Sequence, residues 1–524
     1  MKKYSNSKNN NSNVLNPNNT TYQSFNDCSR VALEYDLFKT TKSSESHLKR
    51  ENANCIAMMF PFYVKASKAK KAVYSVNHLT KKSDSVSSYL TNNMRFYNYV
   101  IQNYGMNESN NSPLSEFIYV PFEKHEKEFK NPKAIGDILL EHGWISDTSS
   151  PHIYKKGNIP ISISPNDIRL FISSSGVGII SLFFNIESNS KFEEYRFKLF
   201  FDEFKSLAKQ VSTKDYISNL VKSYTNVEIL FFEENHLDNT TSYEKRERVR
   251  AIFFCNLTCK KSPELPLIPL WITGHNTFKP LSSDRYEQLL KNRSSLAEGN
   301  TVDTTSEGCM ILNSFDATKK GIKTYYEFHA QSFCQHMFVC YIIAQHQYFC
   351  LHNLTQLSAN IADKKHFSAI TLYKSENYIK SFALIRKNYS FNHISSVTKF
   401  QDAYEAIEKN LNIESFIRET NYTLEPIQLL AEKNIERKKA GILSILSSFT
   451  LLNTLVSIFT VILGEQKRLN AVFFAIIPTF LLISFLTFFV TPNRLQRTLV
   501  FFIEDVYLKV KSIWRKKIKN PKIK

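Results

Sequence analysis

The sequence IRLFISSSGVGIISLFF, residues 168–184, decides the fold of the central part of the chain. Two apolar runs, at 168–172 and 177–184, flank a Ser-Ser-Ser-Gly segment, and small residues followed by glycine are typical of a tight turn. This pattern predicts a β-hairpin. It therefore predicts at least one antiparallel pair of strands within a sheet.

Strand and helix patterns alternate on both sides of this hairpin. Upstream, the run at 117–122 predicts a strand, and Asn131-Pro132 supplies the N-cap and first position of a helix through Leu140. Downstream, a helix is predicted around four phenylalanines, namely Phe197, Phe200, Phe201 and Phe204. Strand-like segments follow it at 227–232, 251–257 and 269–273. The predicted fold class is an α+β (mixed α/β) cytoplasmic domain.

Helical patterns dominate from Tyr325 onward. A long apolar and aromatic helix is predicted at 328–354, and a final helical segment that starts near Thr423 and Pro426 continues as a stalk. The domains that we predict are a disordered Asn-rich tail at 1–53, a cytoplasmic α/β domain at 54–322, a helical/stalk region at 323–439, transmembrane helices at 440–463 and 471–490, and a basic amphipathic cytoplasmic tail at 493–524.

Two segments near the C-terminus carry no formal charge. Residues 440–463 span roughly 36 Å as a helix and residues 471–490 roughly 30 Å, which matches a hydrocarbon core about 30 Å thick. The short connection at 464–470 makes the pair an antiparallel hairpin. The sequence therefore predicts an integral membrane protein of the inner or plasma membrane.

One side of the first predicted transmembrane helix is polar. At 100° per residue, six polar side chains share one arc; they are Ser447, Thr450, Asn453, Thr454, Ser457 and Thr460. Two interpretations remain open: the arc packs against other helices, or several copies of the chain surround a pore. With two helices in each chain, such a pore requires a homo-oligomer.

The net charge of +19 is concentrated toward the ends of the chain. Residues 1–80 carry 12 Lys and Arg against 5 Asp and Glu, and residues 493–524 carry 10 against 2. This distribution favours contact with the head groups of a lipid bilayer, and we expect no nucleic-acid partner. Basic residues that flank the predicted hairpin place both termini in the cytoplasm; those at the membrane interface are Arg437, Lys438, Lys439, Arg494 and Arg497.

The arrangement of a large N-terminal α/β domain, a helical stalk, a C-terminal hairpin and a basic tail resembles the CorA-like metal-ion transporter superfamily. In that family the first membrane helix ends in Gly-Met-Asn, whereas here the segment reads Val-Ile-Leu-Gly464-Glu465-Gln466, so only the glycine matches. The string Tyr104-Gly105-Met106-Asn107 lies far upstream. The resemblance implies a pentameric channel or ion transporter with a cytoplasmic sensing domain. It also implies a variant in which a nucleotide signal opens the pore of an antiviral membrane effector.

Few features of the sequence indicate an enzyme or a metal site. The segment 329–352 is rich in His and Cys, but only pairs such as His336/Cys340 and His346/Cys350 share a helix face, which favours a helical core over a zinc site. Eight cysteines without a signal peptide indicate reduced thiols. We predict no catalytic residue, no metal ligand and no cofactor, with a divalent cation or a nucleotide left open as ligand. The alternative function is a membrane-tethered binding or signalling module, in which the hairpin is only an anchor.

Overall fold

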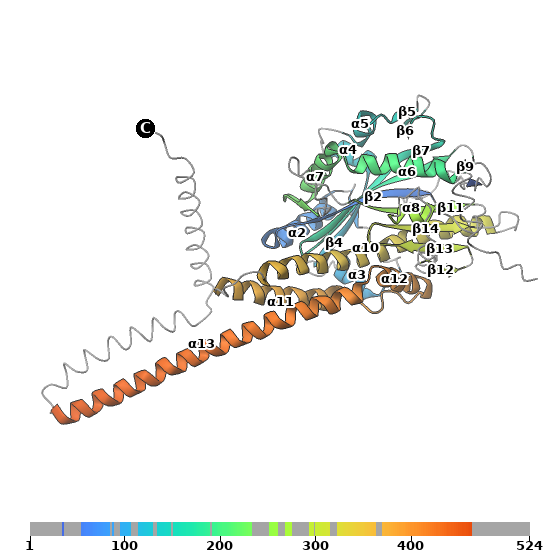
Figure 1. Cartoon of the computed structure of the whole chain (residues 1–524). Helices are drawn as coiled ribbons and strands as arrows, with labels where there is room; N and C mark the ends of the chain where they lie inside the picture. Colours follow the sequence, from blue (N-terminus) through green and yellow to red (C-terminus); the bar gives the residue numbers. More distant parts are fainter. Residues whose placement is uncertain are drawn as a thin grey trace, which may run out of the picture. The chain divides into compact units, whose positions relative to one another are not determined.

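The computed structural model describes residues 34–35, 54–83, 86–88, 95–105, 114–128, 134–147, 150–188, 191–232, 251–259, 268–274, 293–297, 299–314, 322–362 and 369–463. The chain divides into two compact units, residues 1–427 and residues 428–524. The first unit holds a mixed α/β structure, with a sheet-rich N-terminal region followed by helices (Figure 1). This architecture confirms the predicted α/β class of the body.

A twelve-stranded sheet forms the centre of the first unit. Its main strand order is β12-β13-β14-β11-β2-β8-β7-β4-β3, with β10 beside β2, and with β6 joining β5 to β7. β11 and β14 are parallel, whereas β2, β7 and β8 pair antiparallel with their neighbours. The strands of this sheet are β2 (Cys55–Tyr63), β3 (Ser87–Ser88), β4 (Ser115–Pro121), β5 (Ile145–Asp147), β6 (Ser150–Lys155), β7 (Ile161–Ser173), β8 (Val177–Ser188), β10 (Leu230–Phe231), β11 (Ile252–Cys259), β12 (Ser294–Ala297), β13 (Asn300–Thr304) and β14 (Gly308–Ser314).

The predicted hairpin is confirmed as β7 and β8. These strands pair antiparallel from Ile161 opposite Ser188 to Ile172 opposite Gly178, and the Ser-Ser-Ser-Gly segment forms the turn. Gly176 has a φ of +90°, and a Cβ atom there would lie 2.8 Å from the carbonyl oxygen of Val64. Because both the backbone angle and the close approach exclude a side chain, this turn requires glycine.

Helices cover both faces of the sheet, so the central strands are buried on both sides (Figure 1). This double burial explains why β2 reads as a nearly continuous apolar run, CIAMMFPFY. The first face packs against α2 (Ala66–Lys82), α4 (Phe122–Glu128), α5 (Ile135–Glu141), α6 (Glu194–Ala208), α7 (Val211–Thr225) and α8 (Ile268–Ile272). The second face packs against α3 (Asn98–Gly105), α10 (Ile322–Ala362), α11 (Ala369–Tyr389), α12 (Thr398–Asn410) and the start of α13 (Ile413–Leu463).

Several local predictions are confirmed and one is wrong. The four predicted phenylalanines of α6 are all buried against the sheet, and α10 contains the predicted helix at 328–354. Residues 269–273 were expected to form a strand, but they lie in and just after helix α8. A five-residue apolar run is compatible with either state, and periodicity alone does not separate them. The predicted helix at 131–140 begins at Ile135, with Ala134 at the N-cap position.

The predicted tail at 1–53 lies outside the described residues apart from 34–35. These two residues form strand β1 (Glu34–Tyr35), which pairs antiparallel with β9 (Phe192–Glu193). The predicted boundary between an α/β domain and a stalk at residue 323 stays a prediction.

The predicted integral membrane location is contradicted by the part of the chain that the structure describes. None of the helices there is both long enough and apolar enough to cross a membrane. The integral membrane location is therefore corrected, together with the assignments of a transmembrane helix and of ion transport that depended on it. The second predicted span, 471–490, and the tail at 493–524 lie outside the described residues.

The membrane prediction rested on the absence of charged residues at 440–463 and 471–490. The segment 440–463 is the last part of the 51-residue helix α13. The side chains that the structure describes there are Leu443, Leu446, Ser447, Thr450, Asn453, Thr454 and Ser457, all of them exposed. Eight of the 24 residues at 440–463 are Ser, Thr or Asn, and uncharged polar groups also cost free energy in an apolar medium. Absence of charge was therefore an insufficient test.

Candidate functional site

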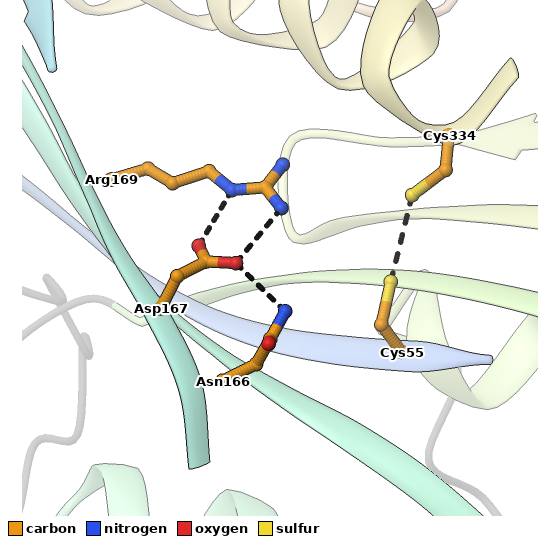
Figure 2. Close-up of polar contacts among 5 residues, drawn as sticks. All are labelled: Cys55, Asn166, Asp167, Arg169 and Cys334. Carbon is orange, nitrogen blue, oxygen red and sulfur yellow. Dashed lines mark hydrogen bonds and ion pairs between the residues drawn. The ribbon is translucent and has the colours of Figure 1, made fainter. Parts of the chain in front are cut away.

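A charged pair lies at the centre of the molecule, between the sheet and α10. Asp167 and Arg169 alternate along β7 and point to the same face, and their side chains are 0% and 1% exposed. The Arg169 Nε atom donates to Asp167 Oδ1 at 2.7 Å, and Nη2 donates to Oδ2 at 3.2 Å (Figure 2). A β-bulge between Pro165 and Asp167 displaces Asn166, whose amide donates to Asp167 Oδ2 at 2.8 Å.

Aromatic rings enclose the guanidinium of this pair. The Arg169 Cζ atom lies 3.5 Å from the ring centroid of Phe183 on β8 and 5.1 Å from that of Phe338 on α10. Burial raises the pKa of Asp167, and the attraction of Arg169 opposes that shift. A buried charged pair depends on such contacts for compensation, and the Phe338 ring links this pair to α10.

A second polar network surrounds His346 on α10. Its Nδ1 atom lies 3.0 Å from the Tyr104 hydroxyl, and its Nε2 atom lies 3.2 Å from both Ser175 Oγ and Cys350 Sγ. The Tyr389 ring packs edge-on against the imidazole at 4.7 Å. The network therefore joins α3, the β7–β8 turn, α10 and α11. His346 and Cys350 share one helix face, as their spacing indicated.

The His346 network holds its groups in neutral form. Burial lowers the pKa of His346 to about 3 and raises the pKa of Cys350 to about 12. A thiolate–imidazolium pair, which a cysteine nucleophile needs, is therefore disfavoured here at neutral pH. Among the described residues no group of three or more His, Cys, Asp and Glu side chains could hold a metal ion.

A carboxyl group at the edge of the α10–α12 contact titrates near neutral pH. Glu408 accepts a hydrogen bond from the Tyr404 hydroxyl at 2.8 Å, and Tyr404 in turn accepts one from Gln347 at 2.8 Å. Burial is the largest cause that raises the pKa of Glu408 to about 7, and the neighbours Glu405 and Glu414 add to it. The folded state therefore binds a proton near Glu408 at a pH where the unfolded chain does not.

We expect Glu408→Gln to flatten the pH dependence of stability. Because the folded pKa lies above the unfolded value of 4.5, the contribution of Glu408 is full below about pH 4.5 and is lost as pH rises through about 7. The variant should exceed the native protein in free energy of unfolding at pH 8 by on the order of 2 kcal/mol, and match it at about pH 4. Chemical denaturation at both pH values measures this. The exposed neighbour Glu405→Gln is the control, and an equal effect in the control would contradict the assignment.

An exposed surface combines two cations with two aromatic rings. We call it the Arg95–Lys399 surface and define it by Arg95, Tyr97, Tyr99 and Lys399. The Tyr97 and Tyr99 rings stack with centroids 5.5 Å apart and 12° between their planes, and they are 38% and 43% exposed. Arg95 is exposed and forms no side-chain ion pair within the described part of the chain.

Backbone contacts hold the two segments of this surface together. The Tyr97 N–H donates to the Ile394 carbonyl at 3.0 Å, and the Ser395 hydroxyl donates to the Arg95 carbonyl. The Tyr99 hydroxyl donates to the His393 carbonyl. The segment before α3 is therefore fixed against the α11–α12 connection, which places Arg95 beside Lys399.

The start of α12 adds positive potential to the same surface. Its N-cap residue Val397 provides no side-chain cap, its first turn holds no acidic residue, and Lys399 occupies that turn. A helix N-terminus carries partial positive charge and normally favours acids there. Partial burial, and then the neighbouring Arg95, lower the pKa of Lys399. Both observations place positive charge at the start of α12, and a helix N-terminus favours anions.

The residues predicted to line a pore lie along the exposed side of α13. Three hydroxyls there donate to carbonyls of their own helix: Thr450 to Leu446 at 2.9 Å, Thr454 to Thr450 at 2.7 Å, and Ser457 to Asn453 at 2.9 Å. Ser447 and Asn453 are also exposed. The side chain of Thr460 lies outside the described ones, so the full predicted arc is not brought together by the structure.

Of the basic residues predicted at a membrane interface, Lys439 is exposed on α13. The side chains of Arg437 and Lys438, and the residues Arg494 and Arg497, lie outside the described part of the chain. Sequence reasoning missed the Arg95–Lys399 surface entirely. The one available signal was the Arg-Phe-Tyr-Asn-Tyr string at 95–99. This string does not indicate a binding surface until the segment 391–399 is known to lie beside it.

Comparison of the chain with protein-family models, with curated proteins and with solved structures found no match. The resemblance to the CorA-like superfamily consequently stays a prediction. Function has to be argued from the geometry of the chain's own residues.

Proposed function

We propose that this chain is a binding module, not an enzyme, and that the Arg95–Lys399 surface takes an anionic ligand with an aromatic ring. The observation that carries the proposal is the pairing of two cations with two stacked, exposed tyrosines at an uncapped helix start. Anionic groups are attracted to the positive potential of this surface, and a flat ring stacks on tyrosine. Nucleotides combine both features in one molecule.

The state of the buried groups supports a role in binding over one in catalysis. His346 and Cys350 form a base–nucleophile contact at 3.2 Å in the interior, and both are held neutral by burial. A catalytic group needs a pKa near the working pH and access to its substrate. The Arg95–Lys399 surface has the access, but its side chains suit recognition and charge neutralisation.

Calorimetric titration of the full-length protein tests the proposal with three matched probes. ATP carries both features, inorganic triphosphate carries only the anion, and adenosine carries only the ring. We expect ATP to bind more tightly than either fragment, by roughly tenfold or more over triphosphate, because base stacking contributes about 1–3 kcal/mol. Absence of ATP binding, or equal affinity for ATP and triphosphate, would contradict the proposal.

A second proposed property is self-association through α13. The exposed face of this helix presents Leu443 and Leu446, which are 65% and 48% exposed, followed by the polar side chains of Thr450 and Asn453. Exposed leucines three positions apart lie on one side of the helix, which a second copy of the helix would cover. The occupant that we propose is another copy of this chain, in line with the predicted homo-oligomer.

We expect Leu443→Glu with Leu446→Glu to lower the mass of the full-length particle to that of one chain, because buried like charges oppose helix pairing. Light scattering after size-exclusion chromatography measures the mass. The matched control is Leu140→Glu, an equally exposed leucine on α5 that should leave the assembly intact. A native protein that is already monomeric would contradict this property without bearing on ligand binding.

A further inference from the structure

Two thiols face each other across the contact between the sheet and α10. Cys55 is the first residue of β2, and Cys334 lies on α10. Their Sγ atoms are 3.5 Å apart, and the side chains point toward one another (Figure 2). Both residues are buried, at 4% and 0% exposure, and neither is in a disulfide.

We propose that Cys55 and Cys334 form an intrachain disulfide when the protein is exposed to hydrogen peroxide. One thiol attacks the peroxide O–O bond and loses its proton as it does so, which gives a sulfenic acid and releases one water. The second thiol attacks the sulfenic sulfur, forms the S–S bond and releases a second water. Two thiols thus lose two electrons and two protons, and one peroxide becomes two waters.

The geometry favours this product because little movement is needed. A disulfide requires an S–S distance of about 2.05 Å, so the sulfurs approach each other by about 1.5 Å. Rotation of the side chains about Cα–Cβ bonds supplies movement on that scale, while β2 and α10 stay packed.

Polar side chains lie beside Cys55 on both neighbouring strands. Cys55 stands directly opposite Asn185 on β8 and opposite Asn256 on β11. The Asn185 Oδ1 atom is buried and has no hydrogen-bond partner. Peroxide is a hydrogen-bond donor of nearly the size of water, and the Asn185 Oδ1 atom is an acceptor for such a donor. The attack therefore takes place in one of the more polar parts of the interior.

The crosslink would fasten α10 to the sheet. The two cysteines are 279 residues apart in the sequence, so the bond would close a very long loop of the unfolded chain. Crosslinks across long loops stabilise the folded state by restricting the unfolded one. We expect the oxidised protein to unfold at a higher temperature than the reduced protein, and dithiothreitol to reverse the shift.

Peptide mapping of the full-length protein tests the proposal. Native protein is treated with hydrogen peroxide, remaining thiols are alkylated under denaturing conditions, and proteolytic fragments are identified by mass. The expected result is a linked pair of fragments that contain Cys55 and Cys334, two hydrogens lighter than their sum, which dithiothreitol separates. Cys340→Ala should retain the linked pair, and Cys334→Ala should lose it.

Two results would overturn the proposal. Cys55 and Cys334 could both remain alkylatable in peroxide-treated, folded native protein, or they could be recovered in sulfinic form without a linked fragment. Because the native protein alone gives these results, a variant that fails to fold does not obscure the outcome.

Discussion

Replacement of Arg169 by methionine is expected to destabilise the protein by about 3–5 kcal/mol, the cost of leaving a buried partner charge unpaired. Asp167 is fully buried and receives two hydrogen bonds from Arg169 at 2.7 and 3.2 Å. Methionine preserves much of the volume between Phe183 and Phe338 but removes both donors and the charge. Chemical denaturation at pH 7 measures the free energy of unfolding.

Two control variants distinguish the effect of breaking the Asp167–Arg169 pair from the effect of removing any arginine. Arg418→Met removes an exposed contact to Glu414 at 4.0 Å, with 66% and 87% of the side chains exposed, and should cost less than about 1 kcal/mol. The double variant Asp167→Leu with Arg169→Met should recover most of the loss, because an apolar pair needs no compensation. If Arg169→Met costs no more than Arg418→Met, the buried pair does not stabilise the fold as expected.

Reversal of charge at Lys399 is expected to weaken ATP binding by roughly a hundredfold, because a charge-assisted contact worth about 1.5–3 kcal/mol is replaced by repulsion. Lys399 occupies the first turn of α12 beside Arg95, where the helix N-terminus adds to the positive potential. Lys399→Glu removes the centre of that potential. Calorimetric titration with ATP at fixed ionic strength gives the ratio of dissociation constants.

Lys409→Glu is the matched control for that experiment, because it makes the same change in net charge in the last turn of the same helix. We expect its ATP affinity to stay within about twofold of the native value, since exposed charges more than about 10 Å apart are largely screened at 0.1 M salt. Equal losses in the two variants would indicate a general effect of net charge and would remove the support for a local site.

The elements that sequence reasoning predicted correctly are those specified by local pattern. The β7–β8 hairpin follows from a turn that only glycine satisfies at Gly176, and α6 follows from phenylalanines at helical spacing. Both signals act within about fifteen residues of chain. The error at α8 arose in a run too short for its period to be read, and the membrane prediction arose from counting charge without weighing polar side chains.

The candidate surface could not be predicted because tertiary structure creates it. Arg95 and Tyr97 form part of a surface only because the α11–α12 connection lies beside them. The contacts that place it there join residues about 300 positions apart. The Asp167–Arg169 pair was hidden for a related reason. In a sequence, charged residues within an apolar strand indicate a face exposed to solvent. In the structure, α10 covers the face of β7 on which Arg169 lies.

The most direct test of the central claim is photo-crosslinking of the native protein with 8-azido-ATP, followed by mapping of the modified peptide. Because Tyr97 and Tyr99 are expected to stack on the base, the account predicts adducts within residues 95–99 or 391–400, and predicts that excess ATP suppresses them. Adducts confined to other segments, or adducts that excess ATP does not suppress, would contradict it.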